Sequence, residues 1–393
     1  MARVGIFHPD LTRRGGAVTV AAHIISALKG DHNLTLYTTT DPDFAELNER
    51  YGTNLRKDDI TIYKISLTSI DLVKKSSSVL NKIFNSNLNL DALKFALIQR
   101  HVRSTDSIDE ELYISTVNEL FINKPSLQYI HFPTFTGGTD SRHISWTPNN
   151  LHKIYREVCK TIVGVENMGS SAVLVANSEW TRDVVQDTYD RRVEVVHPPI
   201  NLEDFNSSTG DREEGFVTVG AIHHRKRQLE MIEIIDGLRS QGFKTHLHIV
   251  GGIDNKPYFE KVRKKSEARD YIHLEGYVER SDLVNIIKTH KYGLHGRPNE
   301  HFGIGVAEMV AGGAIPFVPN GGGQVEIVNN RPELQYESTD VAVRKIKNVV
   351  ENPKLQRNLR EDLESKSNEY SAKKFKNNIL QLVNDIAKNC SVG

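Results

Sequence analysis

The chain has little cysteine: only Cys159 and Cys390 occur among its 393 residues, and they lie far apart. Two isolated thiols give neither a disulfide framework nor the paired spacing of a zinc site, and they fit a reducing compartment. No apolar run is long enough to span a bilayer, and no charged segment followed by an apolar one marks a signal peptide. We therefore expect a cytoplasmic protein that contacts a membrane, if at all, from its cytoplasmic face.

The chain also lacks a net charge, because 50 Lys and Arg residues balance 50 Asp and Glu residues. No global field recruits nucleic acid, so we expect no nucleic-acid partner, and any preference for anions must come from local patches. The dinucleotide fingerprint GxGxxG is absent, which argues against a nicotinamide enzyme. The length allows two α/β domains, each with its own core.

The most informative stretch is residues 292–328, YGLHGRPNEHFGIGVAEMVAGGAIPFVPNGGGQVEIV. A short strand, a glycine loop, a helix and a second strand follow one another there, which predicts a parallel α/β unit. The loop is Phe302-Gly303-Ile304-Gly305, and its glycines allow backbone N–H groups to approach a ligand closely. The helix that begins at this loop adds unpaired donors and the positive end of its dipole, which suits a diphosphate.

Two carboxylates bracket this loop, Glu300 before it and Glu308 inside the helix. A diphosphate is repelled by carboxylates, whereas the vicinal hydroxyls of sugars donate strong hydrogen bonds to them. A nucleotide sugar has a diphosphate between two polyols and satisfies both requirements. From the residues alone, an ordinary glycine turn with solvated glutamates explains the pattern equally well.

Glu300 and Glu308, with seven residues between them, resemble the Glu-x7-Glu signature of retaining GT-B glycosyltransferases of family 4. The run Asn299-Glu300-His301-Phe302-Gly303-Ile304-Gly305-Val306 is especially similar to the GDP-mannose-dependent mannosyltransferases that extend dolichol-linked oligosaccharides. The resemblance implies an α/β, GT-B fold with two Rossmann-like domains facing across a cleft. It also implies transfer of a hexose, with mannose from GDP-mannose favoured, to a hydroxyl of a glycan or lipid-linked acceptor.

The stiff sequence His197-Pro198-Pro199 marks the predicted domain boundary. We expect an acceptor-side domain at 1–199, a donor-binding domain at 200–370, and a helix at 371–393. The resemblance implies that this helix packs back on the first domain. Apolar runs predict strands at residues 3–8, 34–38, 60–65, 112–115, 128–133, 174–178, 193–196, 216–219, 246–250, 272–275, 292–295 and 315–318. Ser178 is the expected N-cap of a helix over residues 179–188.

Two features of the first domain are candidates for the site. Gly15 and Gly16 form a turn into a helix, and in the resembled family this turn lies near the donor phosphate and the acceptor. His131 follows an apolar run in Tyr129-Ile130-His131-Phe132-Pro133, and the resemblance sets this histidine against the donor sugar. The plainer alternatives are a tight turn that needs glycine and a structural histidine.

In the second domain, Lys226 matches the family's lysine, which neutralises the donor diphosphate together with an arginine. The arginine position is occupied by Ala221, a departure from the family, and Arg225 or Arg227 could supply the missing charge. A solvated helix start also explains this basic cluster. Tyr277 follows a predicted strand whose backbone meets the nucleotide base in the family.

The resemblance assigns the remaining roles. Lys226 and the amides of Gly303 to Gly305 stabilise the diphosphate, Glu300 binds sugar hydroxyls, Glu308 binds ribose hydroxyls, and His131 contacts the sugar. The acceptor hydroxyl enters on the face that the diphosphate leaves, so neither a protein nucleophile nor a metal or other cofactor is expected. No Asp-x-Asp motif occurs in a matching loop. A nucleotide-sugar epimerase or hydrolase and a non-catalytic sugar-binding protein remain alternatives.

Residues 72–103 are basic and amphipathic. A helical segment packed by one face, with its lysines solvated, is the plainer interpretation. The alternative is a peripheral membrane contact with anionic lipid, as a lipid-linked acceptor requires.

Overall fold

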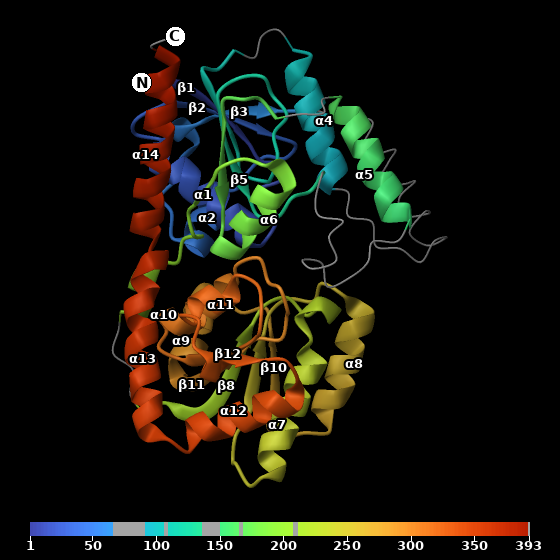
Figure 1. The fold of residues 1–393 in the computed structure, drawn as a ribbon, viewed down its shortest axis with the longest axis vertical. Helices are drawn as coiled ribbons and strands as arrows, with labels where there is room; N and C mark the ends of the chain where they lie inside the picture. Colours follow the sequence, from blue (N-terminus) through green and yellow to red (C-terminus); the bar gives the residue numbers. More distant parts are fainter. Residues whose placement is uncertain (66–90, 106–108, 136–149, 165–167, 207–210, 392–393) are drawn as a thin grey trace. The chain divides into compact units, whose positions relative to one another are not determined.

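The structure is a computed structural model that describes residues 1–65, 91–105, 109–135, 150–164, 168–206 and 211–391. The chain divides into two compact units, which are described separately (Figure 1). The N-terminal unit comprises residues 1–197 and 375–393, and the C-terminal unit comprises residues 198–374.

The N-terminal unit contains a seven-stranded parallel sheet with the order β3-β2-β1-β4-β5-β6-β7. The strands are β1 (Arg3–Phe7), β2 (Asn33–Thr38), β3 (Thr61–Lys64), β4 (Leu112–Ser115), β5 (Ser126–Ile130), β6 (Ala172–Ala176) and β7 (Val193–Val195). The helices are α1 (Gly16–Leu28), α2 (Phe44–Tyr51), α4 (Asp91–Arg103), α5 (Asn150–Val163), α6 (Glu179–Tyr189) and α14 (Ala372–Ser391), and η1 (Lys57–Asp59) is a 3₁₀ turn.

Apolar side chains cover this sheet on both faces, as a parallel sheet requires. Successive residues of a strand point to opposite faces, so Ile6 packs with helix α1 while Phe7 packs with helix α4. Helix α14 completes the α1 side through Phe375, Ile379 and Val383, all of which are buried. The core of this unit therefore includes the last helix of the chain.

Helix α4 is the described part of the basic region 72–103, because residues 66–90 lie outside the described residues. Its face with Phe95, Ile98 and Val102 is buried, as expected for a helix packed by one side. The expectation of solvated lysines is wrong for Lys94. This residue is 8% exposed and its Nζ lies 3.7 Å from a carboxylate oxygen of Asp10.

The C-terminal unit contains a six-stranded parallel sheet with the order β10-β9-β8-β11-β12-β13. The strands are β8 (Glu213–Val219), β9 (Leu247–Val250), β10 (Ile272–Gly276), β11 (His290–Leu294), β12 (Ile315–Pro319) and β13 (Gln335–Tyr336). The helices are α7 (Gln228–Ser240), α8 (Lys256–Glu267), α9 (Arg280–Thr289), α10 (Ile304–Ala311), α11 (Gln324–Ile327), α12 (Thr339–Val350) and α13 (Pro353–Ser367). The 3₁₀ turns are η2 (Leu202–Phe205), η3 (His224–Lys226), η4 (Pro332–Leu334) and η5 (Asn368–Tyr370).

The strand order of this sheet reverses between β8 and β11, since the chain moves outward from β8 through β9 and β10 and then returns to β8's other side. Loops that leave the carboxyl ends of two such strands diverge and open a crevice between them, where α/β proteins bind ligands. The loop after β8 and the loop after β11 carry the predicted donor-site residues. The topology therefore brings residues 220–227 and 295–303 to one edge of the sheet.

The expected strand–loop–helix–strand unit over residues 292–328 is confirmed as β11, α10 and β12. The other expected strands are also present, although β5 ends at Ile130, so that His131 lies in the turn beyond it rather than in the strand. Ser178 caps α6 as predicted, because its Oγ accepts a hydrogen bond from the Thr181 amide at 3.0 Å. None of the described helices is both long and apolar enough to cross a membrane.

Candidate active site

A glycine with a positive φ follows β8 and β9 and ends β10: Gly220 at 150°, Gly251 at 155° and Gly276 at 66°. A Cβ atom on Gly251 would lie 2.0 Å from the carbonyl oxygen of Gly220, so these two backbones touch. A Cβ on Gly220 would lie 3.6 Å from the side chain of Lys226, which passes over it. Glycine is therefore required at Gly251 by the close backbone contact and is favoured at Gly220 by its positive φ, while the Lys226 side chain would be in ordinary van der Waals contact with a Cβ at Gly220.

The loop after β8 forms the short helix η3 (His224–Lys226), which His223 caps: its Nδ1 accepts a hydrogen bond from the Arg225 amide at 3.1 Å. Arg227 then adopts a left-handed conformation, with φ 54°, and starts α7. This local structure fixes the directions in which the side chains of Arg225, Lys226 and Arg227 leave the loop.

Glu300 lies at the centre of the site and is 7% exposed. Its Oε2 accepts from the Nζ of Lys226, and its Oε1 lies 2.9 Å from a guanidinium nitrogen of Arg297. The Nε2 of His295 is 3.6 Å from Oε2. Burial alone would raise the pKa of Glu300, but the charges of Lys226 and Arg297 outweigh this effect and hold the pKa well below its usual range.

A glycine turn holds the backbone of Glu300. The Gly323 amide donates to the Glu300 carbonyl at 2.7 Å, and a Cβ atom on Gly322 would lie 2.6 Å from both the nitrogen and the oxygen of Glu300. Gly321 and Gly322 have φ of 105° and 85°, which L side chains rarely adopt. The glycine turn at 321–323 therefore supports the position of the central carboxylate.

His295, the residue after β11, is buried beside this ion pair. Burial and the nearby charge of Lys226 lower the pKa of His295 to about 3, so its ring is neutral at pH 7. The hydroxyl of Tyr336 donates to the His295 carbonyl and fixes this strand end. The charge next to Glu300 at neutral pH thus comes from the lysine and the arginine.

The cations exceed the carboxylates in this cluster. The pKa of Arg225 is lowered, because partial burial and the charge of Arg297 outweigh the opposing charges of Asp254 and Glu300. These four charged groups therefore interact with one another. Three cations, Arg225, Arg297 and Lys226, thus face two carboxylates, which leaves a positive surplus. Arg227 is directed elsewhere and lies 3.2 Å from Glu230.

Helix α10 begins where the glycine pattern predicts. Gly303 is its N-cap, with φ 110°, and Ile304 is its first residue. Gly305 has a further reason to be glycine, because a Cβ atom there would lie 2.7 Å from the Val219 carbonyl of β8. The first turn of α10 thus packs directly on the strand. Phe302 is 3% exposed and packs edge-on against Tyr370, so only its backbone is available to a ligand.

Glu308 is part of a second ion-pair network. Its Oε1 accepts from the guanidinium of Arg280, whose Nε lies 2.9 Å from a carboxylate oxygen of Asp204. This network links α10, α9 and η2 and orients Glu308 from one side. Tyr277, which follows β10, is 44% exposed.

Gly15, Gly16 and His131 belong to the N-terminal unit. Gly15 has φ 143° and caps α1, which begins at Gly16, so the predicted glycine turn into a helix is confirmed. A Cβ atom on Gly15 would meet nothing within 4 Å, so crowding does not require glycine there.

His131 lies beyond the carboxyl end of β5 and is held by its neighbours. Its Nε2 is 3.1 Å from the Thr116 carbonyl, and its backbone amide donates to Asn118 at 2.8 Å. A carbonyl only accepts, so Nε2 carries the ring proton and Nδ1 keeps the lone pair. Burial lowers the pKa of His131 to about 4, so at neutral pH its ring offers an acceptor. Thr116 also bonds to His8, whose Nδ1 lies 2.8 Å from the threonine hydroxyl.

Three residues of these networks are not predicted from the sequence: Arg297, His295 and Arg280. Arg297 could have been recognised from its place three residues before Glu300 in a loop that joins a strand to a helix. His295 follows β11 in the same way that His131 follows β5. Arg280 gives no local signal, because it meets Glu308 from a separate helix.

Solved structures with a similar architecture include glycosyltransferases. Anabaena HepE in complex with UDP-glucose matches with a TM-score of 0.69 at 12% identity, over 98% of this chain and 100% of that one. WaaG, a glycosyltransferase involved in lipopolysaccharide biosynthesis, matches with a TM-score of 0.67 at 14% identity, over 96% and 99% of the two chains. Two parallel sheets in this order define the GT-B fold, as the sequence predicts.

Two family models cover nearly all of the chain. The model described as Glycosyltransferase Family 4 matches residues 14–204, and the model described as Glycosyl transferases group 1 matches residues 200–366. The chain belongs to glycosyltransferase family 4 and is a glycosyltransferase.

Its relatives include the enzymes named GDP-Man:Man(3)GlcNAc(2)-PP-Dol alpha-1,2-mannosyltransferase. The Dictyostelium discoideum protein is 23% identical over 382 residues, which are 86% of this chain and 75% of the relative. The Xenopus laevis protein is 27% identical over 53% of this chain and 49% of its own length, and the human protein 25% identical over 50% and 46%. The matches thus extend over about half the length of these two vertebrate relatives.

Proposed function

We propose that this glycosyltransferase transfers a hexose with retention of configuration, most favourably mannose from GDP-mannose, to a hydroxyl of a glycan or lipid-linked acceptor. The observation that carries the proposal is the buried carboxylate of Glu300, held between Lys226 and Arg297 at the point where the strand order reverses. The names of the distant mannosyltransferase relatives support the choice of sugar and base.

The donor diphosphate binds to the surplus cations. Lys226, Arg297 and Arg225 surround the centre, and the first amides of α10, with the positive end of its dipole, add uncharged donors beside them. When the diphosphate binds, it replaces the Glu300 carboxylate as the partner of these cations. The carboxylate oxygens then accept hydrogen bonds from sugar hydroxyls.

Further groups bind the rest of the donor. Glu308 accepts the ribose hydroxyls; Arg280 holds its Oε1 and so fixes the carboxylate. His131 accepts a sugar hydroxyl at Nδ1, since its Nε2 proton is committed to Thr116. Gly15 and Gly16 approach the donor phosphate and the acceptor, and Tyr277 contacts the base.

The transfer needs no protein nucleophile. The bond between the sugar C1 and the diphosphate oxygen breaks, the acceptor oxygen forms a bond to C1 on the same face, and a departing phosphate oxygen takes the acceptor's proton. The protein stabilises the negative charge that develops on the diphosphate through Lys226, the arginines and the α10 amides. Positioning and electrostatics supply the catalysis.

A thermal-shift panel of nucleotide sugars tests this function. GDP-mannose and GDP should raise the melting temperature more than UDP-glucose or UDP, because both base and sugar are recognised. Glu300→Gln should reduce the shift given by GDP-mannose while leaving most of the shift given by GDP. Glu333→Gln is a matched control, since Glu333 is also a partly buried carboxylate paired with an arginine. Equal shifts from all donors would contradict the choice of GDP-mannose.

Product analysis separates transfer from the alternative activity. An epimerase or hydrolase on the same scaffold converts the donor without an acceptor. Incubation with donor alone, and then with a mannose-terminated glycan, should give a new glycosidic product only in the second case. Turnover of the donor at the same rate without acceptor would overturn the proposal of transfer.

A lipid-linked acceptor would also require contact with a membrane face through the basic region 72–103. Most of this region lies outside the described residues, and Lys94 is excluded from such a surface because it is buried. Co-sedimentation with vesicles that contain anionic lipid should retain the wild-type protein. No binding to such vesicles would remove this part of the proposal.

A further inference from the structure

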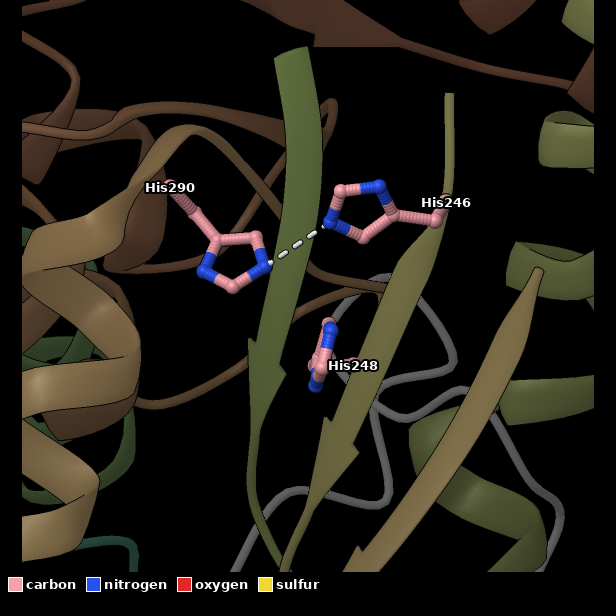
Figure 2. Close-up of side chains that lie close together, drawn as sticks. All are labelled: His246, His248 and His290. Carbon is pink, nitrogen blue, oxygen red and sulfur yellow. Dashed lines mark hydrogen bonds between the residues drawn. The ribbon is translucent and has the colours of Figure 1, made fainter. Parts of the chain in front are cut away.

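Three histidines converge on one side of the C-terminal sheet, at the edge opposite the Glu300 cluster. His246 immediately precedes β9, His248 lies two residues further on the same face, and His290 begins β11 (Figure 2). One ring nitrogen from each lies within 4.8 Å of the others. The Nε2 atoms of His246 and His290 are 3.2 Å apart.

The sheet provides space for these rings. Strand β8 runs between β9 and β11, and its residue beneath the cluster is Gly215. A Cβ atom on Gly215 would lie 2.1 Å from the His246 Nε2, so any side chain there would displace the imidazole. The rings of His246 and His290 can therefore meet across the intervening strand.

Hydrogen bonds at the rear of two rings fix which nitrogen holds a lone pair. The Nδ1 of His290 lies 2.6 Å from the Ile286 carbonyl, and the Nδ1 of His248 lies 2.7 Å from a carboxylate oxygen of Glu275. Both oxygens only accept, so each Nδ1 carries the proton and each Nε2 keeps its lone pair. This is the arrangement of metal-binding histidines, whose second nitrogen donates to a carbonyl or a carboxylate.

A carboxylate supplies a fourth donor. Glu213 pairs in register with His290 on the neighbouring strand, and its Oε2 lies 3.2 Å from the His246 Nε2. Tetrahedral Zn²⁺ with bonds of about 2.0–2.1 Å separates its ligand atoms by about 3.4 Å. The two 3.2 Å separations match this value, and the remaining separations among the three histidine nitrogens exceed it by at most about 1.4 Å.

We propose that His246, His248 and His290, with Glu213, bind one Zn²⁺ ion at the amino ends of the strands. Imidazole and carboxylate ligands in a tetrahedral arrangement suit zinc among the abundant divalent cations. The ion replaces the proton that His246 shares with His290 and Glu213. It ties β8, β9 and β11 together and stabilises the sheet, while the transfer reaction takes place at the opposite edge.

The test is a zinc titration of the full chain, free of any histidine tag and first depleted of metal with a chelator. A competing chromophoric chelator reports the affinity. We expect one tightly bound Zn²⁺ per chain, and His246→Gln and His248→Gln should weaken binding by on the order of 100-fold or more, since outer partners alone contribute about 10–100-fold. Glu275→Gln should weaken it by about 10-fold through the outer contact. His273→Gln is the matched control, because its ring lies 4.5 Å from that of His248 but outside the cluster, and it should bind zinc as the wild type does.

Stability provides a second measurement. At a zinc concentration 100 times the dissociation constant, the folded-to-unfolded ratio of the C-terminal unit should rise about 100-fold. Glu213→Gln, at a residue whose side chain is 57% exposed, should fold normally and still lose part of this gain. Wild-type protein that binds no zinc, or His246→Gln and His248→Gln variants that are folded and bind it unchanged, would overturn the proposal.

Discussion

Lys226 is the residue whose removal tests the donor site most directly. A hydrogen bond to a charged group is worth about 1.5–3 kcal/mol net. In the structure the lysine already pairs with Glu300, and a diphosphate must compete with that pair, which favours the lower half of this range. Removing Lys226 also leaves Glu300 less neutralised and more repulsive to phosphate, which adds to the loss. Lys226→Ala should therefore weaken GDP binding by about 10–100-fold, since each 1.4 kcal/mol corresponds to about tenfold.

Isothermal titration with GDP measures this loss, and circular dichroism confirms that the variant is folded. Lys265→Ala is a matched control, because Lys265 lies in the same unit, has a similarly covered side chain (23% exposed against 25% for Lys226) and pairs with Glu233. It should bind GDP as the wild type does. A folded Lys226→Ala protein with a GDP affinity within about twofold of the wild type would refute the assignment of Lys226 to the diphosphate.

Three further predictions concern catalysis, packing and pH. Glu300→Gln should lower kcat/KM about 100- to 1,000-fold, the usual cost of losing one preorganised polar contact, and steady-state transfer assays with unchanged rates would contradict its role. Gly305→Ala should destabilise the C-terminal unit by about 1–3 kcal/mol, because its Cβ would press on the Val219 carbonyl; Gly252→Ala, which meets nothing within 4 Å, is the control in a denaturant titration. Burial lowers the pKa of His23 to about 4. Between pH 6.5 and 4 the unfolded state therefore binds the proton of His23 more readily than the folded state does. The free energy of unfolding should thus fall by about 2 kcal/mol from pH 7 to pH 5, and His23→Gln should remove that part of its pH dependence.

Local signals predicted much of the fold and part of the site. The apolar runs gave the strands, and the glycines at 303 and 305 gave the start of α10, because a left-handed N-cap and a close helix–strand contact both require a small residue. Ser178 was recognisable as an N-cap for the same kind of local reason. The two-residue strand β13 was missed, since it has no length over which a pattern can repeat.

The pairing of charges was not predictable in the same way. Arg280 reaches Glu308 from α9, and Lys226 reaches Glu300 from a loop 74 residues earlier, so both pairs exist only because the sheet order brings separate segments together. Phe302 illustrates the opposite case. Its place in the glycine motif indicates a ligand contact, whereas its side chain packs in the core against Tyr370.

The place of α14 has a consequence for biosynthesis. Phe375, Ile379 and Val383 fill the core under α1, yet the ribosome makes them after every residue of the C-terminal unit. Domains usually fold in the order in which they emerge. Here the first half of the polypeptide must wait, with part of its hydrophobic surface uncovered, until translation of the second half is nearly complete. Nascent chains stalled before residue 375 should thus engage chaperones through their N-terminal half.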